Sequence, residues 1–315
     1  MRVVVTGGAG FIGANLVAEL ESRHTVRDVV VVDDLSTGDA ENLRERRARL
    51  LVGSILDPDL LDAALDGADA VVHLAAVPSV PRSVADPLRS HHVNATGTVE
   101  VLQAVRRAGG PHLVVASSSS VYGRNPRLPK HEGLRAEPLS PYGVSKLAAE
   151  SYAIAFAECY RLSVIPFRFF NVFGPLQAAG HAYAAVIPAF LEAALAGRPL
   201  PVHGDGRQSR DFTYVATVCR VLADAAIDGV ASTEPVNLAF GTRTTLLELV
   251  GEIEQILGHA VTVENTPPRE GDIRDSQADN ALLRRLFPSV EPTPLLTGLA
   301  ETVAWFRSRQ PQMAG

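Results

Sequence analysis

The chain has 315 residues, of which 46% are hydrophobic, and its 35 acidic and 29 basic residues give a net charge of −6. This length and apolar content suit one large α/β unit or two closely joined lobes with an ample core. The charges are interspersed and no Lys/Arg block stands out, so we expect no nucleic-acid partner. No apolar run reaches the length of a membrane span, so we expect no membrane partner either.

Cysteine and histidine usage gives no sign of a metal site. Cys159 and Cys219 lie far apart and belong to no Cys-x-x-Cys pair, and the nine histidines show no metal-ligand spacing. Reduced thiols are typical of the cytoplasm. We therefore expect a cytoplasmic protein without a bound metal.

Strand-like and helix-like segments alternate through the first half of the chain. Apolar runs predict strands at residues 3–6, 29–33, 70–75, 113–117 and 163–170. The segments between them predict helices at 12–21, 58–65, 94–107 and 141–160. This alternation indicates an α/β fold with a Rossmann-type doubly wound parallel sheet.

The second half has a different character. Proline and glycine cluster at residues 197–201, 204–206 and 267–272, which indicates loops of a smaller C-terminal α/β lobe for a substrate. We expect residues 1–175 to form the dinucleotide-binding domain, with later strands contributed from about 205–240. Residues 176–315 are then mainly the substrate lobe.

A glycine-rich segment follows the first predicted strand. Gly7, Gly10 and Gly13 recur at three-residue spacing, where the strand gives way to an apolar helical pattern. A backbone without Cβ atoms can turn tightly here and bring its N–H groups and the positive end of a helix against a pyrophosphate. The strand before it and the helix after it make the motif a strong indication of a bound dinucleotide.

An acidic residue stands twenty positions after Gly13. Asp33 ends the apolar run 29–32, which is typical of a buried parallel strand. Its carboxylate can accept hydrogen bonds from the adenosine ribose hydroxyls and would repel a 2′-phosphate. Since no Arg or Lys lies between Asp33 and Leu43, the sequence predicts NAD rather than NADP.

A tyrosine and a lysine stand four residues apart at the start of the predicted helix 141–160. Ser140 is a suitable N-cap and Pro141 a suitable first helical residue, so Tyr142 and Lys146 share one helix face. A tyrosine normally titrates near 10, but a neighbouring ammonium and the positive nicotinamide ring favour the phenolate. Tyr142 is therefore the candidate general base for a hydroxyl proton.

A row of serines, residues 117–120, follows the apolar strand at 113–115. In an open parallel sheet the carboxyl ends of the strands face the ligand crevice. Hydroxyl groups at this point can hydrogen-bond a sugar hydroxyl and help to relay its proton.

Together these motifs resemble the extended short-chain dehydrogenase/reductase family, and within it the nucleotide-sugar 4-epimerases. The segments 73–76, 169–175 and 210–212 add to the match, which covers almost the whole chain. The resemblance implies Ser118, Tyr142 and Lys146 as catalytic residues. It implies an NAD site made of Gly7, Gly10, Phe11, Ile12, Gly13, Asp33, Leu35, Ser36, Thr37, Gly38, Ser54, Ile55, Leu74, Ala75, Ala76, Asn94, Tyr142, Lys146 and Phe169.

One position separates two branches of that family. The dehydratases and decarboxylases usually carry a glutamate just before Val-Tyr-Gly, where this chain has Ser120. A neutral hydroxyl cannot remove the sugar C5 proton, which favours 4-epimerisation through a 4-keto sugar. The alternatives are a dehydratase or decarboxylase, a UDP-glucuronate 4-epimerase, and a non-enzymatic NAD-sensing regulator. Uronate epimerases often have threonine in place of Asn171.

Several segments resemble bacterial epimerases that interconvert UDP-N-acetylglucosamine and UDP-N-acetylgalactosamine, although Pro78 and Ser54 depart from the pattern of relatives. By this resemblance Arg210 and Arg269 hold the diphosphate, and Ser276 leaves room for an N-acetyl group where glucose-only members carry tyrosine. The same resemblance allows the unsubstituted UDP-glucose and UDP-galactose. The implied UDP-sugar site comprises Ser79, Arg82, Ser118, Ser119, Ser120, Tyr142, Asn171, Ala185, Val186, Val202, Gln208, Arg210, Arg269, Asp272 and Ser276.

The family resemblance also implies a homodimer. The predicted helices 94–107 and 141–160 would pair with their copies as a four-helix bundle. Val99, Leu102 and Val105 form an apolar stripe that fits such an interface, and packing of the same stripe on the sheet is the alternative.

Overall fold

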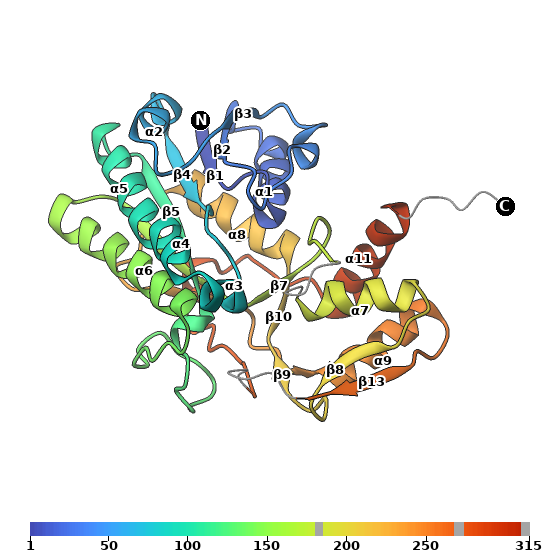
Figure 1. Cartoon of the computed structure of the whole chain (residues 1–315). Helices are drawn as coiled ribbons and strands as arrows, with labels where there is room; N and C mark the ends of the chain where they lie inside the picture. Colours follow the sequence, from blue (N-terminus) through green and yellow to red (C-terminus); the bar gives the residue numbers. More distant parts are fainter. Residues whose placement is uncertain (180–184, 268–273, 310–315) are drawn as a thin grey trace.

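A seven-stranded sheet lies at the centre of the computed structural model, which describes residues 1–179, 185–267 and 274–309. In order across the sheet the strands are β11 (Val236–Leu238), β6 (Val164–Phe169), β5 (His112–Ser118), β4 (Ala70–His73), β1 (Arg2–Thr6), β2 (Asp28–Asp33) and β3 (Arg49–Val52). All neighbouring pairs are parallel (Figure 1). The predicted doubly wound, Rossmann-type sheet is confirmed.

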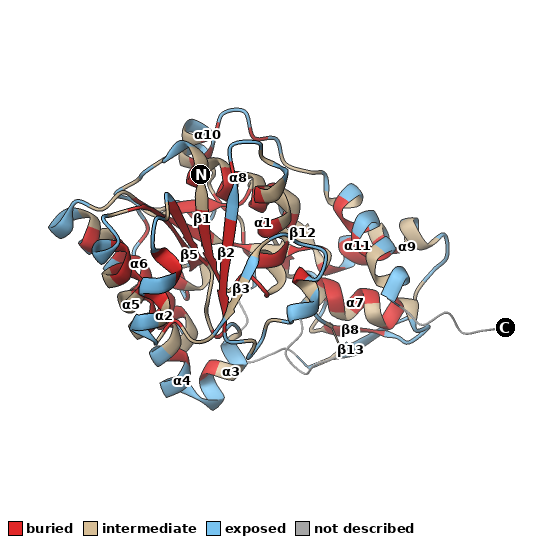
Figure 2. Cartoon of the chain, turned by 90° about the horizontal axis from the view of Figure 1, so that it is seen from above, coloured by how far each residue is buried: buried red, intermediate tan, exposed pale blue. Residues whose placement is uncertain are grey.

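Helices cover both faces of this sheet. One face packs against α1 (Phe11–Ser22) and α8 (Val215–Asp228), and the other against α2 (Pro58–Leu65), α5 (Gly97–Arg107) and α6 (Pro141–Tyr160). Side chains of successive strand residues point to opposite faces of the sheet, so Val3 and Val5 belong to one core cluster and Val4 to the other. Figure 2 shows the central strands buried between the helices, which explains their nearly unbroken apolar sequence, whereas the edge strand β3 is partly exposed.

Local signals at helix ends set the bounds of α2 and α6. Ser140 accepts a hydrogen bond from Gly143 N (3.1 Å), and Pro141 follows as the first helical residue. Asp57 caps α2 in the same manner. Both helices have the predicted bounds, 58–65 and 141–160.

Other predicted elements are shorter than expected. The strand predicted at 70–75 ends at His73, after which the backbone N–H of Leu74 makes one more bond to Thr6 O (3.0 Å). The helix predicted at 94–107 begins only at Gly97. Before it the chain forms α3 (Val80–Ala85), α4 (Pro87–His91) and a π-helical turn, η2 (His92–Thr96).

The apolar stripe on α5 does not face outward. Leu102 and Val105 are fully buried in the cluster between α5 and the sheet, and Val99 packs beside them. The expectation that this stripe forms a dimer interface is therefore wrong, because α5 lies over the sheet and uses these residues for its own core.

Short two-stranded sheets build the second lobe. They pair β7 (Asn171–Phe173) with β10 (Phe212–Tyr214), β8 (Leu200–His203) with β13 (Val263–Thr266), and β9 (Ser209–Arg210) with β12 (Thr244–Thr245). Around them lie α7 (Val186–Leu195), α9 (Leu246–Leu257) and α11 (Leu295–Arg309), on the right of Figure 1. The short helix α10 (Ala281–Leu286) packs instead beside β11 of the large sheet. In the described residues no helix combines the length and apolarity needed to span a bilayer.

Candidate active site

The predicted cofactor and catalytic residues follow strands that lie side by side. From β1 the chain winds outward through β3 in one direction, and from β4 through β6 in the other, so the switch point lies between β1 and β4. Gly7 follows β1, Asp33 ends β2, residues 74–76 follow β4, Ser118 ends β5 and Phe169 ends β6. Because parallel strands end at the same edge, these groups line one border of the sheet.

The glycine-rich turn is packed too tightly for any side chain. Gly7 has φ +73°, and a Cβ on it would lie 2.7 Å from the backbone N of Ala75. A Cβ on Gly13 would lie 2.1 Å from Gly7 O. Gly10 begins α1 without a side-chain cap. The turn therefore leaves the start of α1 open to an anionic group, which fits the pyrophosphate of NAD.

Asp33 is buried beside this turn. Its Oδ2 accepts a hydrogen bond from Ala9 N and its Oδ1 from Leu35 N, both at 2.9 Å. Burial raises the pKa of the carboxyl, while the two backbone hydrogen bonds work against that rise. Gly38 packs against the carboxylate, since a Cβ there would lie 3.0 Å from both oxygens. A carboxylate at the end of β2 fits the ribose of NAD.

Other predicted cofactor residues have mainly internal contacts. The Asn94 side chain bonds to Val77 N (2.7 Å), Val77 O (3.2 Å) and Ser145 Oγ (3.0 Å). Ser54 Oγ accepts from Leu56 N (3.1 Å), and Ile55 is buried. Ser36 and Thr37 are exposed, whereas Phe11, Ile12 and Leu35 pack partly buried against the core. Direct contact of these residues with the dinucleotide stays a prediction.

Tyr142 and Lys146 project from the first two turns of α6 onto β5. Tyr142 is half-buried and hydrogen-bonded to Ser118, while Lys146 is buried and its Nζ donates to Ala116 O (2.8 Å). Burial raises the pKa of Tyr142, and the Ser118 hydrogen bond opposes that rise. Burial lowers the pKa of Lys146 to about 8. The charge of Lys146 does not contribute to the shift of the Tyr142 pKa, and the expected acidification of Tyr142 by the ammonium together with the nicotinamide ring stays a prediction.

His73, the last residue of β4, is buried close enough to Lys146 to feel its charge, and its side chain is neutral. Burial, followed by the positive charge of Lys146, lowers the pKa of His73 to about 3. Its ring nitrogens contact Thr6 Oγ1 (2.7 Å) and Thr98 Oγ1 (3.0 Å), and Thr98 donates its own proton to Asn94 O (2.6 Å). Thr98 must therefore accept from His73 Nε2, which fixes the tautomer.

The serines at 117–120 do not all face the proposed site: Ser117 points into the core. Ser118 Oγ accepts from Ser120 N (3.1 Å) and begins the single turn η3 (Ser119–Val121), in which Ser119 and Ser120 are half-buried. Ser117 points elsewhere and donates to Glu150 Oε2 (2.7 Å). Sequence reasoning missed Glu150, although its place four residues after Lys146 was a readable signal.

The predicted substrate residues come together from distant segments. Arg210 Nη1 donates to Ser209 O (2.9 Å) and Arg274 O (3.1 Å), and Ser276 N donates to Ser209 O (3.1 Å). Asn171 N donates to the backbone oxygen of Asp211 (3.2 Å), which brings β7 to the same place. Arg269 and Asp272 lie outside the described residues.

The remaining substrate candidates differ in exposure. Ser79, Arg82, Val186 and Gln208 are half-buried and Ala185 is exposed. Gln208 Nε2 donates to His203 O (2.5 Å). The Val202 side chain is fully buried in the core, so the predicted contact with uridine could be made only by its backbone. These assignments remain predictions.

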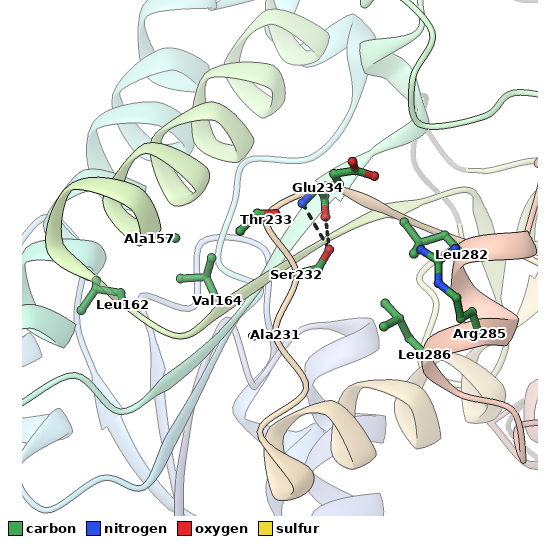
Figure 3. A pocket seen from close by; sticks show the side chains of 10 residues that line it. All are labelled: Ala157, Leu162, Val164, Ala231, Ser232, Thr233, Glu234, Leu282, Arg285 and Leu286. Carbon is green, nitrogen blue, oxygen red and sulfur yellow. Dashed lines mark hydrogen bonds between the residues drawn. The ribbon is translucent and has the colours of Figure 1, made fainter.

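A pocket elsewhere on the molecule takes no part in this site (Figure 3). Val164 on its wall is the first residue of β6, and Glu234 precedes β11, so the pocket lies at the amino ends of these strands. Ala157, Leu162 and Arg285 also line it. No predicted cofactor, catalytic or substrate residue is among its lining residues.

Comparison with known proteins agrees with this geometry. The family described as "NAD dependent epimerase/dehydratase family" matches residues 3–239. A UDP-glucose 4-epimerase of Mycolicibacterium smegmatis is 37% identical over 315 residues, covering 98% of this chain and 99% of that protein.

Two solved structures have the same fold over nearly their whole length. A UDP-N-acetylglucosamine 4-epimerase from Methanobrevibacter ruminantium M1, in complex with UDP-N-acetylmuramic acid, has a TM-score of 0.92 and 37% identity, covering 98% of this chain and 99% of that one. A UDP-glucuronic acid 4-epimerase from Bacillus cereus, with UDP-glucuronic acid and NAD, has a TM-score of 0.89 and 28% identity at 98% and 99% coverage. The chain therefore belongs to the NAD dependent epimerase/dehydratase family and is an NAD-dependent enzyme of that family.

Proposed function

We propose that this protein is a UDP-sugar 4-epimerase that interconverts UDP-N-acetylglucosamine and UDP-N-acetylgalactosamine, with UDP-glucose and UDP-galactose as a second pair of substrates. The observation that carries the proposal is the hydrogen-bonded Ser118–Tyr142 pair at the carboxyl edge of the sheet, with Lys146 one turn further along α6. The same edge carries the glycine turn and Asp33, which suit NAD.

In this proposal each residue of the pair has a defined task. Tyr142 takes the proton of the sugar 4-hydroxyl and returns it at the end of the cycle, and Ser118 orients the two oxygens between which the proton moves. Bound NAD supplies reversible hydride uptake, so that the sugar passes through a 4-keto form. When NAD is bound, its positive nicotinamide ring together with Lys146 would lower the pKa of Tyr142.

Ser120 supports epimerisation over dehydration or decarboxylation. The position lies within η3, two residues after the proposed catalytic Ser118, and carries a neutral hydroxyl. Removal of a C5 proton needs a base at this point, and a hydroxyl with an ordinary pKa cannot act as one.

The substrate side supports the choice of sugar. Ser276 has a small side chain. It follows Asp275, which forms an isolated β-bridge with Ser209, the residue before Arg210. The M. ruminantium relative acts, by its description, on UDP-N-acetylglucosamine, and the M. smegmatis relative on UDP-glucose. We propose that residues 1–175 mainly hold NAD and residues 176–315 mainly hold the UDP-sugar.

We also propose a homodimer, built on α6 rather than on the α5 stripe. Positions 144, 148, 151, 152, 155 and 159 of α6 form one outward stripe without a charged residue, and Val144 and Tyr152 are 51% and 46% exposed. Leu88 of the adjoining α4 is 80% exposed. Uncovered apolar side chains of this kind are typical of an interface. A monomeric mass by light scattering at micromolar concentration would contradict this proposal.

A cytoplasmic location completes the proposal and rests on the two free thiols, Cys159 and Cys219. Cell fractionation tests it, and recovery of the protein with secreted material would contradict it.

Parallel incubation with UDP-N-acetylglucosamine, UDP-glucose and UDP-glucuronate, followed by chromatography of the products, tests the function. We expect a mixture of 4-epimers from UDP-N-acetylglucosamine and slower conversion of UDP-glucose. A keto-deoxy product would indicate a dehydratase. Preferential conversion of UDP-glucuronate would indicate a uronate epimerase, and no turnover of any UDP-sugar would refute the proposed activity.

A further inference from the structure

Three side chains on one stripe of α6 contact three consecutive residues of β5. Tyr142 is hydrogen-bonded to Ser118, and Lys146 donates to Ala116 O at 2.8 Å. One turn further on, Glu150 accepts from Ser117 Oγ at 2.7 Å. The first two contacts belong to the proposed reaction, whereas the third lies deeper in the protein and has no part in the proton transfer.

The carboxylate of Glu150 also binds a second strand. Arg168 of β6 donates through Nη2 to Oε1 (2.6 Å) and through Nε to Oε2 (2.9 Å). Ser117 and Arg168 are register partners in the sheet, so Glu150 joins α6 to both members of one cross-strand pair. The side chains of Arg168 and Glu150 are only 5% and 4% exposed.

Arg168 is itself held in place. Its Nη1 donates to Glu132 O (3.2 Å), and its guanidinium carbon lies 4.7 Å from the centre of the Tyr122 ring. The Tyr122 hydroxyl in turn donates to Asn237 Oδ1 (2.7 Å) on β11. Glu150 is therefore attached to a fixed partner, not to a side chain free to follow α6.

We propose that Glu150 is a positioning residue that sets where α6 lies along β5, and thereby the contact between Tyr142 and Ser118. The proposal rests on the proposed role of Tyr142 as the base. A helix slides past a strand as one body, so a clamp two turns from Tyr142 fixes the phenol as well. Proton transfer demands such precision, since a displacement of about 1 Å can reduce a rate by about 100-fold.

A double substitution separates positioning from simple stabilisation. Replacing a complete buried ion pair by apolar groups of similar size often leaves stability unchanged, whereas removing one partner strands a charge. The test variant is therefore Glu150→Met with Arg168→Met. The control is Asp62→Met with Arg107→Met, which removes an ion pair between α2 and α5 whose side chains are 47% and 44% exposed.

For the test variant we expect kcat for the UDP-sugar to fall by about 10- to 100-fold. KM, the NAD content per chain and the melting temperature should stay near those of the wild type. Wild-type kcat in the test variant, or a loss of NAD that matches the loss of rate, would overturn the proposal. The control should match the wild type in every measurement.

A second variant covers the case in which the double substitution does not fold. Ser117→Ala removes only the β5 arm of the clamp and leaves the ion pair in place. We expect kcat to fall several-fold with an unchanged melting temperature, and a wild-type kcat would overturn the proposal.

Hydrogen exchange distinguishes failure of the positioning role from failure of the proposed function. Both variants should show faster amide exchange in residues 116–118 and in the first two turns of α6, while α2 and α5 stay protected as in the wild type. Unchanged exchange in residues 116–118 and α6 would overturn the proposal. If the wild type converts no UDP-sugar, the proposed function fails, and exchange alone then decides whether Glu150 positions α6.

Discussion

Two proposed regions of this molecule are built in opposite ways: the catalytic edge, at the carboxyl ends of β1, β2 and β4 to β6, and the substrate side, made of the short two-stranded sheets. The catalytic edge lies along one continuous sheet, whose β5 and β6 alone share six register pairs. The substrate side is assembled from pairs of two to four residues that join segments far apart in the chain, such as Ser209 with Asp275 and Val202 with Asn265. The first region can hold reacting groups rigidly, whereas the second depends on a few long-range bonds.

Two buried carboxylates express this difference. Glu150, under the catalytic edge, is paired with the guanidinium of Arg168. Asp211, on the substrate side, is fully buried and accepts from Gly241 N (3.0 Å), Ala278 N (3.0 Å) and Thr242 Oγ1 (2.9 Å). Burial raises the pKa of Asp211, and these hydrogen bonds oppose the rise. The catalytic edge should therefore govern kcat, and the substrate side KM.

The largest effect should come from Tyr142→Phe. Loss of the proton acceptor should lower kcat by about 1,000-fold, within the usual range for a general base, with KM changed only slightly. Product chromatography over long incubations measures the residual rate. Tyr160→Phe is the matched control, because this tyrosine lies at the other end of the same helix and is 43% exposed. Activity retained in Tyr142→Phe would remove the basis of the proposed function.

Asp211→Asn should have the next largest effect. The amide oxygen of asparagine can keep the bonds from Gly241 N and Ala278 N, but its NH₂ then faces the hydroxyl that donates to Asp211 Oδ1, and the negative charge that strengthens all three bonds is lost. We expect KM to rise about tenfold with kcat nearly unchanged, and the free energy of unfolding to fall by about 3 kcal/mol.

Substrate kinetics and urea unfolding measure these two effects of Asp211→Asn. Asp205→Asn, on an exposed turn of the same lobe, should show neither. A fall in kcat at constant KM would contradict the contrast between the two regions.

Lys146→Met should change how stability depends on pH. The pKa of Lys146 is lowered from 10.5 to about 8, so between these values the unfolded chain binds the proton better than the folded chain. Burial of the charged ammonium therefore destabilises the folded protein. This penalty is absent above pH 10.5, grows as pH falls between 10.5 and about 8, and is complete below about 8. The gap corresponds to about 3 kcal/mol.

We expect the methionine variant to be more stable than the wild type at pH 7, with an advantage that shrinks as pH rises toward 10.5. Urea unfolding of the apoproteins at several pH values measures this difference. If the two proteins differed in unfolding free energy by the same amount at every pH, burial of the Lys146 ammonium would not destabilise the fold.

The smallest effect should come from Asp62→Asn. Its ion pair with Arg107 (2.7 Å) is exposed to water and belongs to neither region. We expect a loss of at most about 1 kcal/mol in unfolding free energy and no change in kcat or KM. A larger loss would mean that exposed charges contribute to this fold as buried ones do.

The catalytic edge was predictable because its signals are local. The Gly7–Gly13 spacing, the apolar run before Asp33 and the Ser140 cap of α6 each lie within a short stretch of sequence. Glu150 and Arg168 were missed, since their pairing joins a helix to a strand and neither residue carries a motif of its own.

The substrate side offered few such signals. β9 and β12 have two residues each, and their pairing depends on contacts made across the lobe rather than on apolar alternation. β3 was also missed, because this short edge strand has only three consecutive apolar residues, 50–52, and is partly exposed. The turn before α3 was unexpected as well, since Ser79 adopts φ 93°, a value that favours glycine.

The position of α8 and β11 has a consequence for dividing the chain. Both come from the second half of the sequence, yet α8 packs on α1 and on β4 and β5, and β11 completes the edge beside β6. A fragment that stops at residue 175 would keep α1 over β1 and β2 but lose α8, so the same sheet face would be uncovered over β4 and β5. We therefore expect the proposed NAD-binding half to need residues 215–238 before its sheet is covered, and a fragment cut at residue 175 to aggregate rather than to bind the cofactor on its own.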